Sequence, residues 1–197
     1  MNRVLSLVIM LCCVLSACGE LRGERVVSGA AADSPTPVAL GGERGVNEVR
    51  SVHGNHAFSF FATELFTGRS VSGAELVADG PVVMSFLVPQ CSVCIAAAPD
   101  LAVSATENPD ITYVFVHSGA SAEDYRAFLD ETGLGHGGEQ SNNTVHIDDS
   151  PGLLWARFGV IQQPTNVLVS HDGAVTQALG ALSKPQLDEV AGRLVLR

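Results

Sequence analysis

Two cysteines, Cys91 and Cys94, stand where an apolar run gives way to an alanine-rich stretch. The apolar run, 82–88, has the length and continuity of a buried strand, and the residues that follow favour a helix. A strand that delivers a C-x-x-C pair to the first turn of a helix places the leading thiol beside unpaired backbone N–H groups, which stabilise a thiolate. We therefore expect Cys91 to be the nucleophile and Cys94 to resolve a mixed disulfide formed on it.

The N-terminus reads as an export signal, because a basic residue precedes an apolar stretch that is too short to span a membrane. Residues 15–18, Leu-Ser-Ala-Cys, resemble the lipobox of bacterial lipoproteins. This resemblance implies a signal peptide at 1–17 and an acylated Cys18 at the start of the mature chain. Cleavage elsewhere, as in a plain signal peptide, is the alternative. With lipid on Cys18, only Cys91 and Cys94 remain as thiols.

The rest of the chain divides into a tether and one domain. Residues 18–56 are rich in Gly, Ala, Ser and charge and show no sustained periodicity, which is typical of a solvated linker. Residues 57–197 have the size and apolar content of a single domain. The chain carries 21 acidic against 11 basic residues, a net charge of −10, and has no basic run. Nucleic acid is therefore an improbable partner.

Strand-like and helix-like segments alternate along the domain. Besides the central run, we expect strands at 58–61, 70–71, 111–116, 144–147, 165–169 and 174–179, and helices at 91–106, 121–133, 151–158 and 183–194. The Asp172-Gly173 pair predicts a hairpin between the last two strands. This order predicts an α/β fold with a central mixed sheet, flanked by helices and with short additional strands at its N-terminal end.

Several separated motifs in this order resemble the thioredoxin fold, and more closely its exported TlpA-like and redoxin-type branch. They are Phe58, 65–68, Cys91-Ser92-Val93-Cys94, Pro99, the segment 158–165 (Phe-Gly-Val-Ile-Gln-Gln-Pro-Thr), Asp172-Gly173 and Gly180. The resemblance implies a thiol–disulfide oxidoreductase that acts on protein substrates. It also implies that the Gln163–Pro164 bond is cis and that Pro164 packs across from the dithiol and helps to present the partner.

The chain departs from the family at three places. Gln90 stands where relatives commonly have tryptophan, so an aromatic docking surface is reduced. Ser85 stands where thioredoxins keep a buried acid that assists the second thiol, so proton transfer at Cys94 must use another group or water. The dipeptide between the cysteines, Ser92-Val93, lacks the histidine or proline of well-known members. The direction of electron flow is therefore open.

Alternatives to redox exchange remain. A static disulfide is unattractive, because closing so short a loop stabilises little. His117 follows a strand, and with Cys91 and Cys94 it would resemble the copper site of delivery proteins of this fold, although their cysteine spacing is usually wider. A surface or capping role is the commoner explanation for such a histidine. A redoxin-type peroxidase is a further alternative, disfavoured by the C-x-x-C pair.

We thus expect a lipid-anchored extracytoplasmic enzyme that exchanges disulfides with proteins through Cys91, Cys94 and Pro164 and needs no cofactor. A membrane electron donor or acceptor is its expected second partner, because such a domain lies outside the cytosolic thiol pool. The resemblance is compatible with three tasks, namely reduction of apocytochrome c, correction of wrong disulfides and oxidation of exported proteins.

Overall fold

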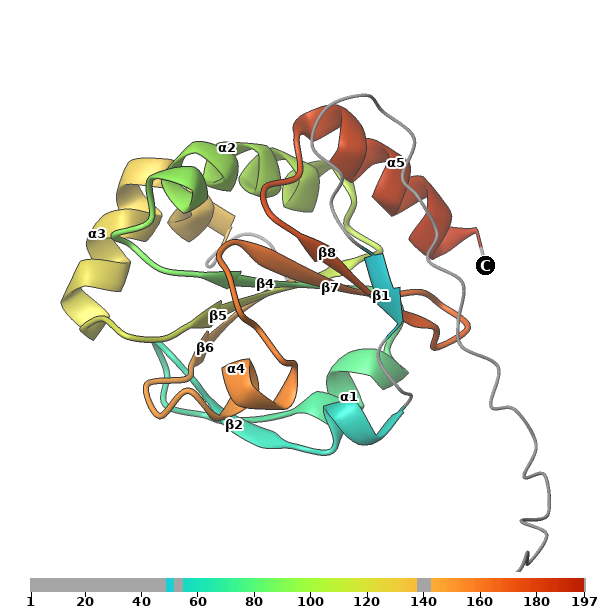
Figure 1. Cartoon of the computed structure of the whole chain (residues 1–197), viewed down its shortest axis with the longest axis horizontal. Helices are drawn as coiled ribbons and strands as arrows, with labels where there is room; N and C mark the ends of the chain where they lie inside the picture. Colours follow the sequence, from blue (N-terminus) through green and yellow to red (C-terminus); the bar gives the residue numbers. More distant parts are fainter. Residues whose placement is uncertain (1–48, 52–54, 138–142, 197) are drawn as a thin grey trace, which may run out of the picture. The chain divides into compact units, whose positions relative to one another are not determined.

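An eight-stranded mixed sheet organises the domain (Figure 1), with the strand order β1-β8-β7-β4-β5-β6-β2-β3. The computed structural model describes residues 49–51, 55–137 and 143–196, so the predicted signal peptide, Cys18 and most of the predicted tether lie outside the described residues. The strands are β1 (Val49–Ser51), β2 (Phe61–Glu64), β3 (Ser70–Ser72), β4 (Val82–Leu87), β5 (Thr112–His117), β6 (Thr144–Asp148), β7 (Thr165–Val169) and β8 (Val175–Leu179).

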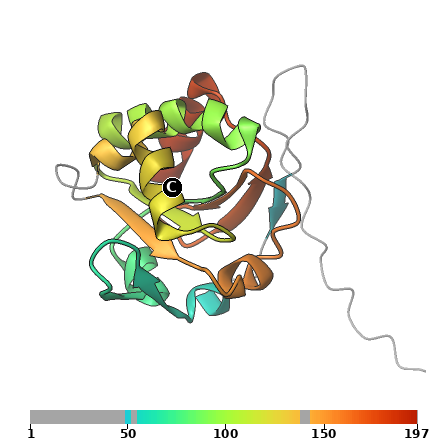
Figure 2. The same ribbon diagram turned by 90° about the vertical axis from the view of Figure 1, so that its left-hand side faces the viewer.

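Helices cover both faces of the sheet, as Figures 1 and 2 show. On one face lie α2 (Ser92–Glu107), α3 (Ala122–Thr132) and α5 (Lys184–Val195), and on the other lie α1 (Gly73–Ala78) and α4 (Leu153–Arg157). Short 3₁₀ turns occupy Asn55–Phe58 and Leu134–Gly137. The α/β fold expected from the sequence, with a central mixed sheet flanked by helices, is confirmed.

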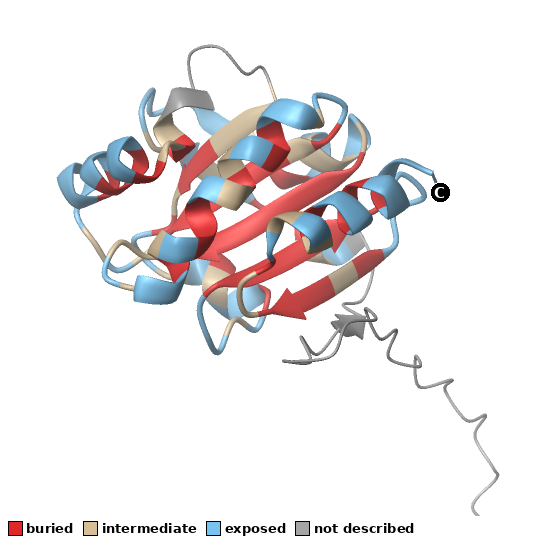
Figure 3. Cartoon of the chain, turned by 90° about the horizontal axis from the view of Figure 1, so that it is seen from above, coloured by how far each residue is buried: buried red, intermediate tan, exposed pale blue. Residues whose placement is uncertain are grey.

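The strand that leads to the dithiol is buried on both faces (Figure 3), and all six residues of β4 are buried. It pairs in parallel with β5 and antiparallel with β7. Alternate residues of β4 enter two separate cores: Val83 and Leu87 join the core beneath α2, α3 and α5, and Met84 and Phe86 join the core on the α4 side. A continuous apolar run is therefore what this central position requires.

Several local signals in the sequence are confirmed. Ser121 caps α3 in a reciprocal capping box with Asp124, and Gly133 ends that helix at φ 78°, in the left-handed region that glycine adopts without strain. The Asp172-Gly173 pair joins β7 to β8 in an antiparallel hairpin, with Gly173 at φ 80°. Helix α2 begins at the predicted place and runs through Pro99.

The prediction of a strand at 58–61 is wrong. Phe58 ends a 3₁₀ turn and β2 begins only at Phe61. The physical reason lies in the local backbone bonds, because the N–H of Ser59 donates to the carbonyl of His56 and the N–H of Phe60 donates to the carbonyl of Phe58. Backbone groups that close turns in this way are not available to the ladder of a strand.

Two further elements were not predicted from the sequence. Strand β1 lies inside the range predicted as tether and pairs antiparallel with β8, so the sheet begins before residue 57. Helix α1 follows β3 directly, capped by the Ser72 side chain, which accepts from the backbone N–H of Glu75. Its first residue must be small, because a Cβ on Gly73 would lie 2.5 Å from the carbonyl oxygen of Phe58.

Candidate active site at the start of α2

Cys91 is the N-cap of α2, at the junction that the sequence predicts. Its backbone is extended, with φ −92° and ψ 108°, and its Sγ accepts a hydrogen bond from the backbone N–H of Cys94 at 3.1 Å. The N–H of Cys91 in turn donates to the carbonyl of Val88 at 3.2 Å, which closes the turn after β4. The sulfur thus occupies the place where a capping oxygen usually sits, and the helix start stabilises negative charge on it.

The two cysteines form a disulfide, with a Cα–Cα distance of 5.1 Å. They differ sharply in access to solvent. Cys91 is partly exposed and is followed by the exposed residues Ser92 and Val93, whereas Cys94 is 0% exposed. A thiol or disulfide on a protein partner therefore reaches Cys91, and only Cys91 can reach Cys94. This asymmetry matches the roles of an attacking and a resolving thiol.

Pro164 lies next to the end of β4. It precedes β7, whose first residue, Thr165, is in register with Phe86, and the Gln163–Pro164 bond is cis as predicted. The Pro164 ring is buried, and its carbonyl accepts from the N–H of Gly180 at 2.8 Å, which ties it to the start of the connection to α5. The preceding residues 161–163 are exposed, and Ile161 is 76% exposed. The segment ahead of Pro164 therefore faces solvent, with the Gln162 carbonyl accepting from Thr165 Oγ1 at 2.8 Å.

Asn166 is a site residue that the sequence analysis missed. Ser85 Oγ donates a 2.7 Å hydrogen bond to Asn166 Oδ1, and Asn166 Nδ2 donates to the carbonyl of Gly180 at 3.2 Å. Both side chains are buried. Ser85 lies two residues from both Val83 and Leu87 and so shares their face of β4. It therefore faces the core that also contains Cys94. The position at which thioredoxins keep an acid is thus occupied here by one half of a neutral hydrogen-bonded pair.

His117 is not a surface histidine. It is 1% exposed, and its Nε2 lies 3.1 Å from Nδ1 of His146 on the neighbouring strand. Burial lowers the pKa of His117 well below its ordinary value and the pKa of His146 to about 4. Within the described residues no group of three or more His, Cys, Asp and Glu side chains lies close enough together to hold a metal ion. The geometry therefore does not favour the copper site considered from the sequence.

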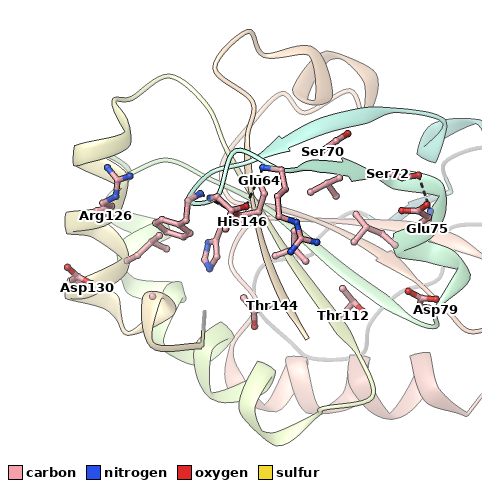
Figure 4. A pocket seen from close by; sticks show the side chains of 18 residues that line it. Glu64, Ser70, Ser72, Glu75, Asp79, Thr112, Arg126, Asp130, Thr144 and His146 are labelled. Carbon is pink, nitrogen blue, oxygen red and sulfur yellow. Dashed lines mark hydrogen bonds between the residues drawn. The ribbon is translucent and has the colours of Figure 1, made fainter. Parts of the chain in front are cut away.

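A groove of about 1010 Å³ lies away from the dithiol (Figure 4). Its walls come from α1, α3, β6 and the turn between β2 and β3, and its charged lining residues are Glu64, Arg69, Glu75, Asp79, Arg126 and Asp130. Phe66 and His146 meet edge to face in its wall, at 5.2 Å between ring centroids. Cys91, Cys94 and Pro164 do not line this groove. The candidate active site is therefore a surface feature around the partly exposed Cys91 rather than a deep pocket.

Comparison with known proteins places this geometry in a family. No family model matches the chain. The soluble secreted antigen MPT53 of Mycobacterium tuberculosis and Mycobacterium bovis is 31% identical over 148 residues, which cover 75% of this chain and 80% of MPT53.

Two solved structures extend the comparison. A secreted disulfide oxidoreductase of M. tuberculosis, described as homologous to E. coli DsbE, is 31% identical with a TM-score of 0.59 over 71% of this chain and 97% of its own. The M. tuberculosis protein DsbF, solved in mixed oxidised and reduced forms, is 26% identical with a TM-score of 0.64 over 73% and 100% of the two chains. The chain belongs to the thioredoxin-fold thiol–disulfide oxidoreductases related to DsbE and MPT53.

Proposed function

We propose that this protein exchanges disulfides with protein substrates outside the cytoplasm, with Cys91 as the attacking and Cys94 as the resolving thiol. The observation that carries the proposal is the asymmetric pair, a partly exposed Cys91 that caps α2 and a buried Cys94 joined to it in one disulfide. The secreted disulfide oxidoreductase of M. tuberculosis, 31% identical, supports both the activity and the extracytoplasmic location.

Both directions of exchange use the same two bonds. In reduction, the Cys91 thiolate attacks a substrate disulfide, one substrate sulfur leaves as a thiol, and a mixed disulfide forms. The Cys94 thiolate then attacks the Cys91 sulfur, which releases the second substrate thiol and leaves the Cys91–Cys94 disulfide. Two electrons have passed to the substrate. In oxidation a substrate thiolate attacks Cys91 of the disulfide, Cys94 leaves as a thiol, and a second substrate thiol displaces Cys91.

Pro164 is proposed to hold the backbone that receives the substrate. Its place beside the end of β4 and the hydrogen bond that its carbonyl accepts from Gly180 support this role, as do the exposed residues 161–163 that precede it. Replacement of Pro164 by alanine should then slow exchange with a protein partner more than it lowers stability. Unchanged exchange with the partner in Pro164→Ala would remove Pro164 from the mechanism.

Membrane attachment is proposed from the lipobox-like residues 15–18. Cleavage after residue 17 and acylation of Cys18 would anchor the domain through the tether that follows, and a membrane protein would supply or remove electrons. Among the described residues no helix is long and apolar enough to cross a membrane. The name of MPT53 calls that relative soluble, so lipidation is a proposal for this chain alone. Mass spectrometry of membrane-extracted protein tests it, and an unmodified soluble product would contradict it.

The decisive experiment is the redox equilibrium of the chain without residues 1–18, measured in graded glutathione buffers by thiol trapping. A reversible transition that requires both Cys91 and Cys94 supports the proposal. A reduction potential of about −270 mV for the pair favours a reductant, and a potential between about −180 and −120 mV favours an isomerase or oxidant. A pair that stays inert across all buffers would contradict disulfide exchange.

The two alternatives from the sequence have separate tests. The copper chaperone predicts tight copper binding that His117→Ala abolishes, whereas the burial of His117 against His146 predicts weak binding unaffected by this change. The peroxidase predicts consumption of hydroperoxide at the expense of the dithiol. Membership of the TlpA-like branch remains a prediction. The substrate also remains a prediction, and the candidates are apocytochrome c, mispaired proteins and newly exported proteins. Trapping of partners with Cys94→Ser can distinguish these candidates.

A further inference from the structure

Tyr125 connects α3 to the ends of the two central parallel strands. The side chain is 2% exposed, and its hydroxyl donates to the carbonyl of Ser118 at 2.5 Å and lies 3.4 Å from the carbonyl of Leu87. Leu87 and His117 form the last pair of the ladder between β4 and β5, and Ser118 follows that pair. The single proton is donated to Ser118, and the Leu87 carbonyl is a second, longer contact, so one hydroxyl lies against both strands where their pairing ends.

The reactive cysteine follows directly from this point. Only three residues separate Leu87 from Cys91, and the turn between them is closed by the hydrogen bond from Cys91 N–H to the Val88 carbonyl. The position of the Leu87 carbonyl therefore sets where the turn begins. This turn also sets the position of Cys91 Sγ relative to the N–H of Cys94. That interaction stabilises the thiolate of Cys91.

Buried histidines hold the Tyr125 ring in place. The His117 ring lies 4.3 Å from the Tyr125 ring between centroids, and the His146 ring stacks behind it at 5.4 Å, with 9° between the two imidazole planes. Among the residues that the structure describes, His117 Nδ1 and His146 Nε2 are buried and have no hydrogen-bond partner. Two buried polar atoms left without partners cost stability, so this cluster is a poor way to stabilise a core. A purely structural purpose explains it badly.

The hydroxyl of Tyr125 is a permanent donor. Burial raises the pKa of Tyr125, and the nearby carboxylates of Asp148 and Asp149 raise it further, against the lowering effect of the hydrogen bond to Ser118. The group therefore keeps its proton at any pH at which the dithiol works. Its hold on the two carbonyls does not depend on pH.

We propose that Tyr125 is a positioning residue for the dithiol, which fixes the end of β4 so that the following turn presents Cys91 Sγ to the first turn of α2. The proposal rests on the proposed role of Cys91 as the reactive thiol. Loss of the hydroxyl loosens the turn and weakens the interaction between the N–H groups and the thiolate. The pKa of Cys91 then rises, and the dithiol becomes harder to reduce because its reduced form is less stabilised.

The test compares Tyr125→Phe with a matched variant, Tyr113→Phe. Tyr113 is also fully buried in the same core, on β5, and its hydroxyl lies 2.7 Å from Ser104 Oγ of α2, so its removal also costs one buried hydrogen bond. The measurements are the equilibrium constant with glutathione, the pH midpoint of Cys91 alkylation and urea unfolding, on the chain without residues 1–18.

We expect Tyr125→Phe to shift the glutathione equilibrium towards the disulfide by about threefold or more, the equivalent of one ordinary hydrogen bond, and to raise the alkylation midpoint. Tyr113→Phe should lose comparable stability but leave both redox measurements at the wild-type value. Equal redox behaviour of the two variants would overturn the role of Tyr125. A wild-type protein without a reversible transition would overturn the proposed function, and this role with it.

A second variant covers the case in which Tyr125→Phe does not fold. Replacement of Tyr125 by 3-fluorotyrosine keeps the ring and makes the hydroxyl a stronger donor. The alkylation midpoint should then fall and the glutathione equilibrium should shift towards the dithiol, the opposite of the effect of phenylalanine. An unchanged midpoint in a folded fluorotyrosine protein would overturn the proposal.

Discussion

The hydroxyl of Ser85 on β4 donates a 2.7 Å hydrogen bond to Oδ1 of Asn166, its register partner on β7. The pair joins the strand that leads to the dithiol to the strand that follows Pro164. Asn166 Nδ2 also donates to the carbonyl of Gly180, and the N–H of Gly180 donates to the carbonyl of Pro164. Three segments around the site therefore share one buried polar network.

This network predicts energetic coupling between Ser85 and Asn166. Ser85→Ala leaves Asn166 Oδ1 buried without this donor, so we expect a loss of about 1–3 kcal/mol in the free energy of unfolding. In a double-mutant cycle with Asn166→Ala, the coupling should be about 1 kcal/mol. Urea unfolding of the four proteins measures it. Strictly additive losses would show that the hydrogen bond contributes nothing of its own.

The accessibility of the two sulfurs predicts different single-cysteine proteins. In Cys94→Ser the partly exposed Cys91 keeps its place at the start of α2, so it should react readily with iodoacetamide and trap partners as stable mixed disulfides. In Cys91→Ser the fully buried Cys94 should react at least about tenfold more slowly, because reagent reaches it only through local opening. Timed alkylation with mass detection gives both rates. Similar rates would contradict the assigned roles.

The buried histidine pair predicts a loss of stability in acid. Both histidines have lowered pKa values in the folded protein, that of His146 to about 4, so between the unfolded value near 6.5 and about 4 the unfolded state binds more protons. Stability from these groups is thus full above pH 6.5 and declines as the pH falls. For His146 we expect a loss of roughly 2 kcal/mol by pH 4.5, and the lowered pKa of His117 acts in the same direction.

The matched protein for this prediction is the double variant His117→Phe/His146→Leu, which removes both titrating groups. Its free energy of unfolding should change much less between pH 7 and pH 4.5, as measured by urea titration at each pH. If wild type and double variant declined in parallel, other groups would be responsible for the acid sensitivity.

The contact between Gly73 and Phe58 predicts a steric effect far from the dithiol. A Cβ at position 73 would lie 2.5 Å from the Phe58 carbonyl and from the Phe60 ring, so Gly73→Ala should cost about 1–3 kcal/mol. Gly192 is exposed on α5 with nothing within 4 Å of such a Cβ, and alanine there should stabilise the helix by about 0.5–1 kcal/mol. Thermal unfolding of Gly73→Ala and Gly192→Ala measures the two changes in stability. The equilibrium constant with glutathione should stay at the wild-type value in both variants.

Local sequence signals predicted most of the elements. The continuous apolar run of β4, the capping residues Ser121 and Gly133 and the Asp172-Gly173 turn are short-range patterns whose physical cause lies within a few residues. The place of Cys91 at the start of α2 follows from the same kind of signal. The prediction failed at 58–61, where the phenylalanines look strand-like but Asn55–Phe58 forms a 3₁₀ turn and the N–H of Phe60 donates to the carbonyl of Phe58.

The sequence by itself determined that this protein has one C-x-x-C pair between a buried strand and a helix, and hence which sulfur stands at the helix start. Only the tertiary structure decided what surrounds that pair. Asn166 reaches Ser85 across 81 positions, and Tyr125 reaches Leu87 across 38, because strand register and the docking of α3 set these distances. Such contacts leave no periodic trace along the chain. Burial also overruled composition at His117, a residue that reads as a surface group and lies in the core.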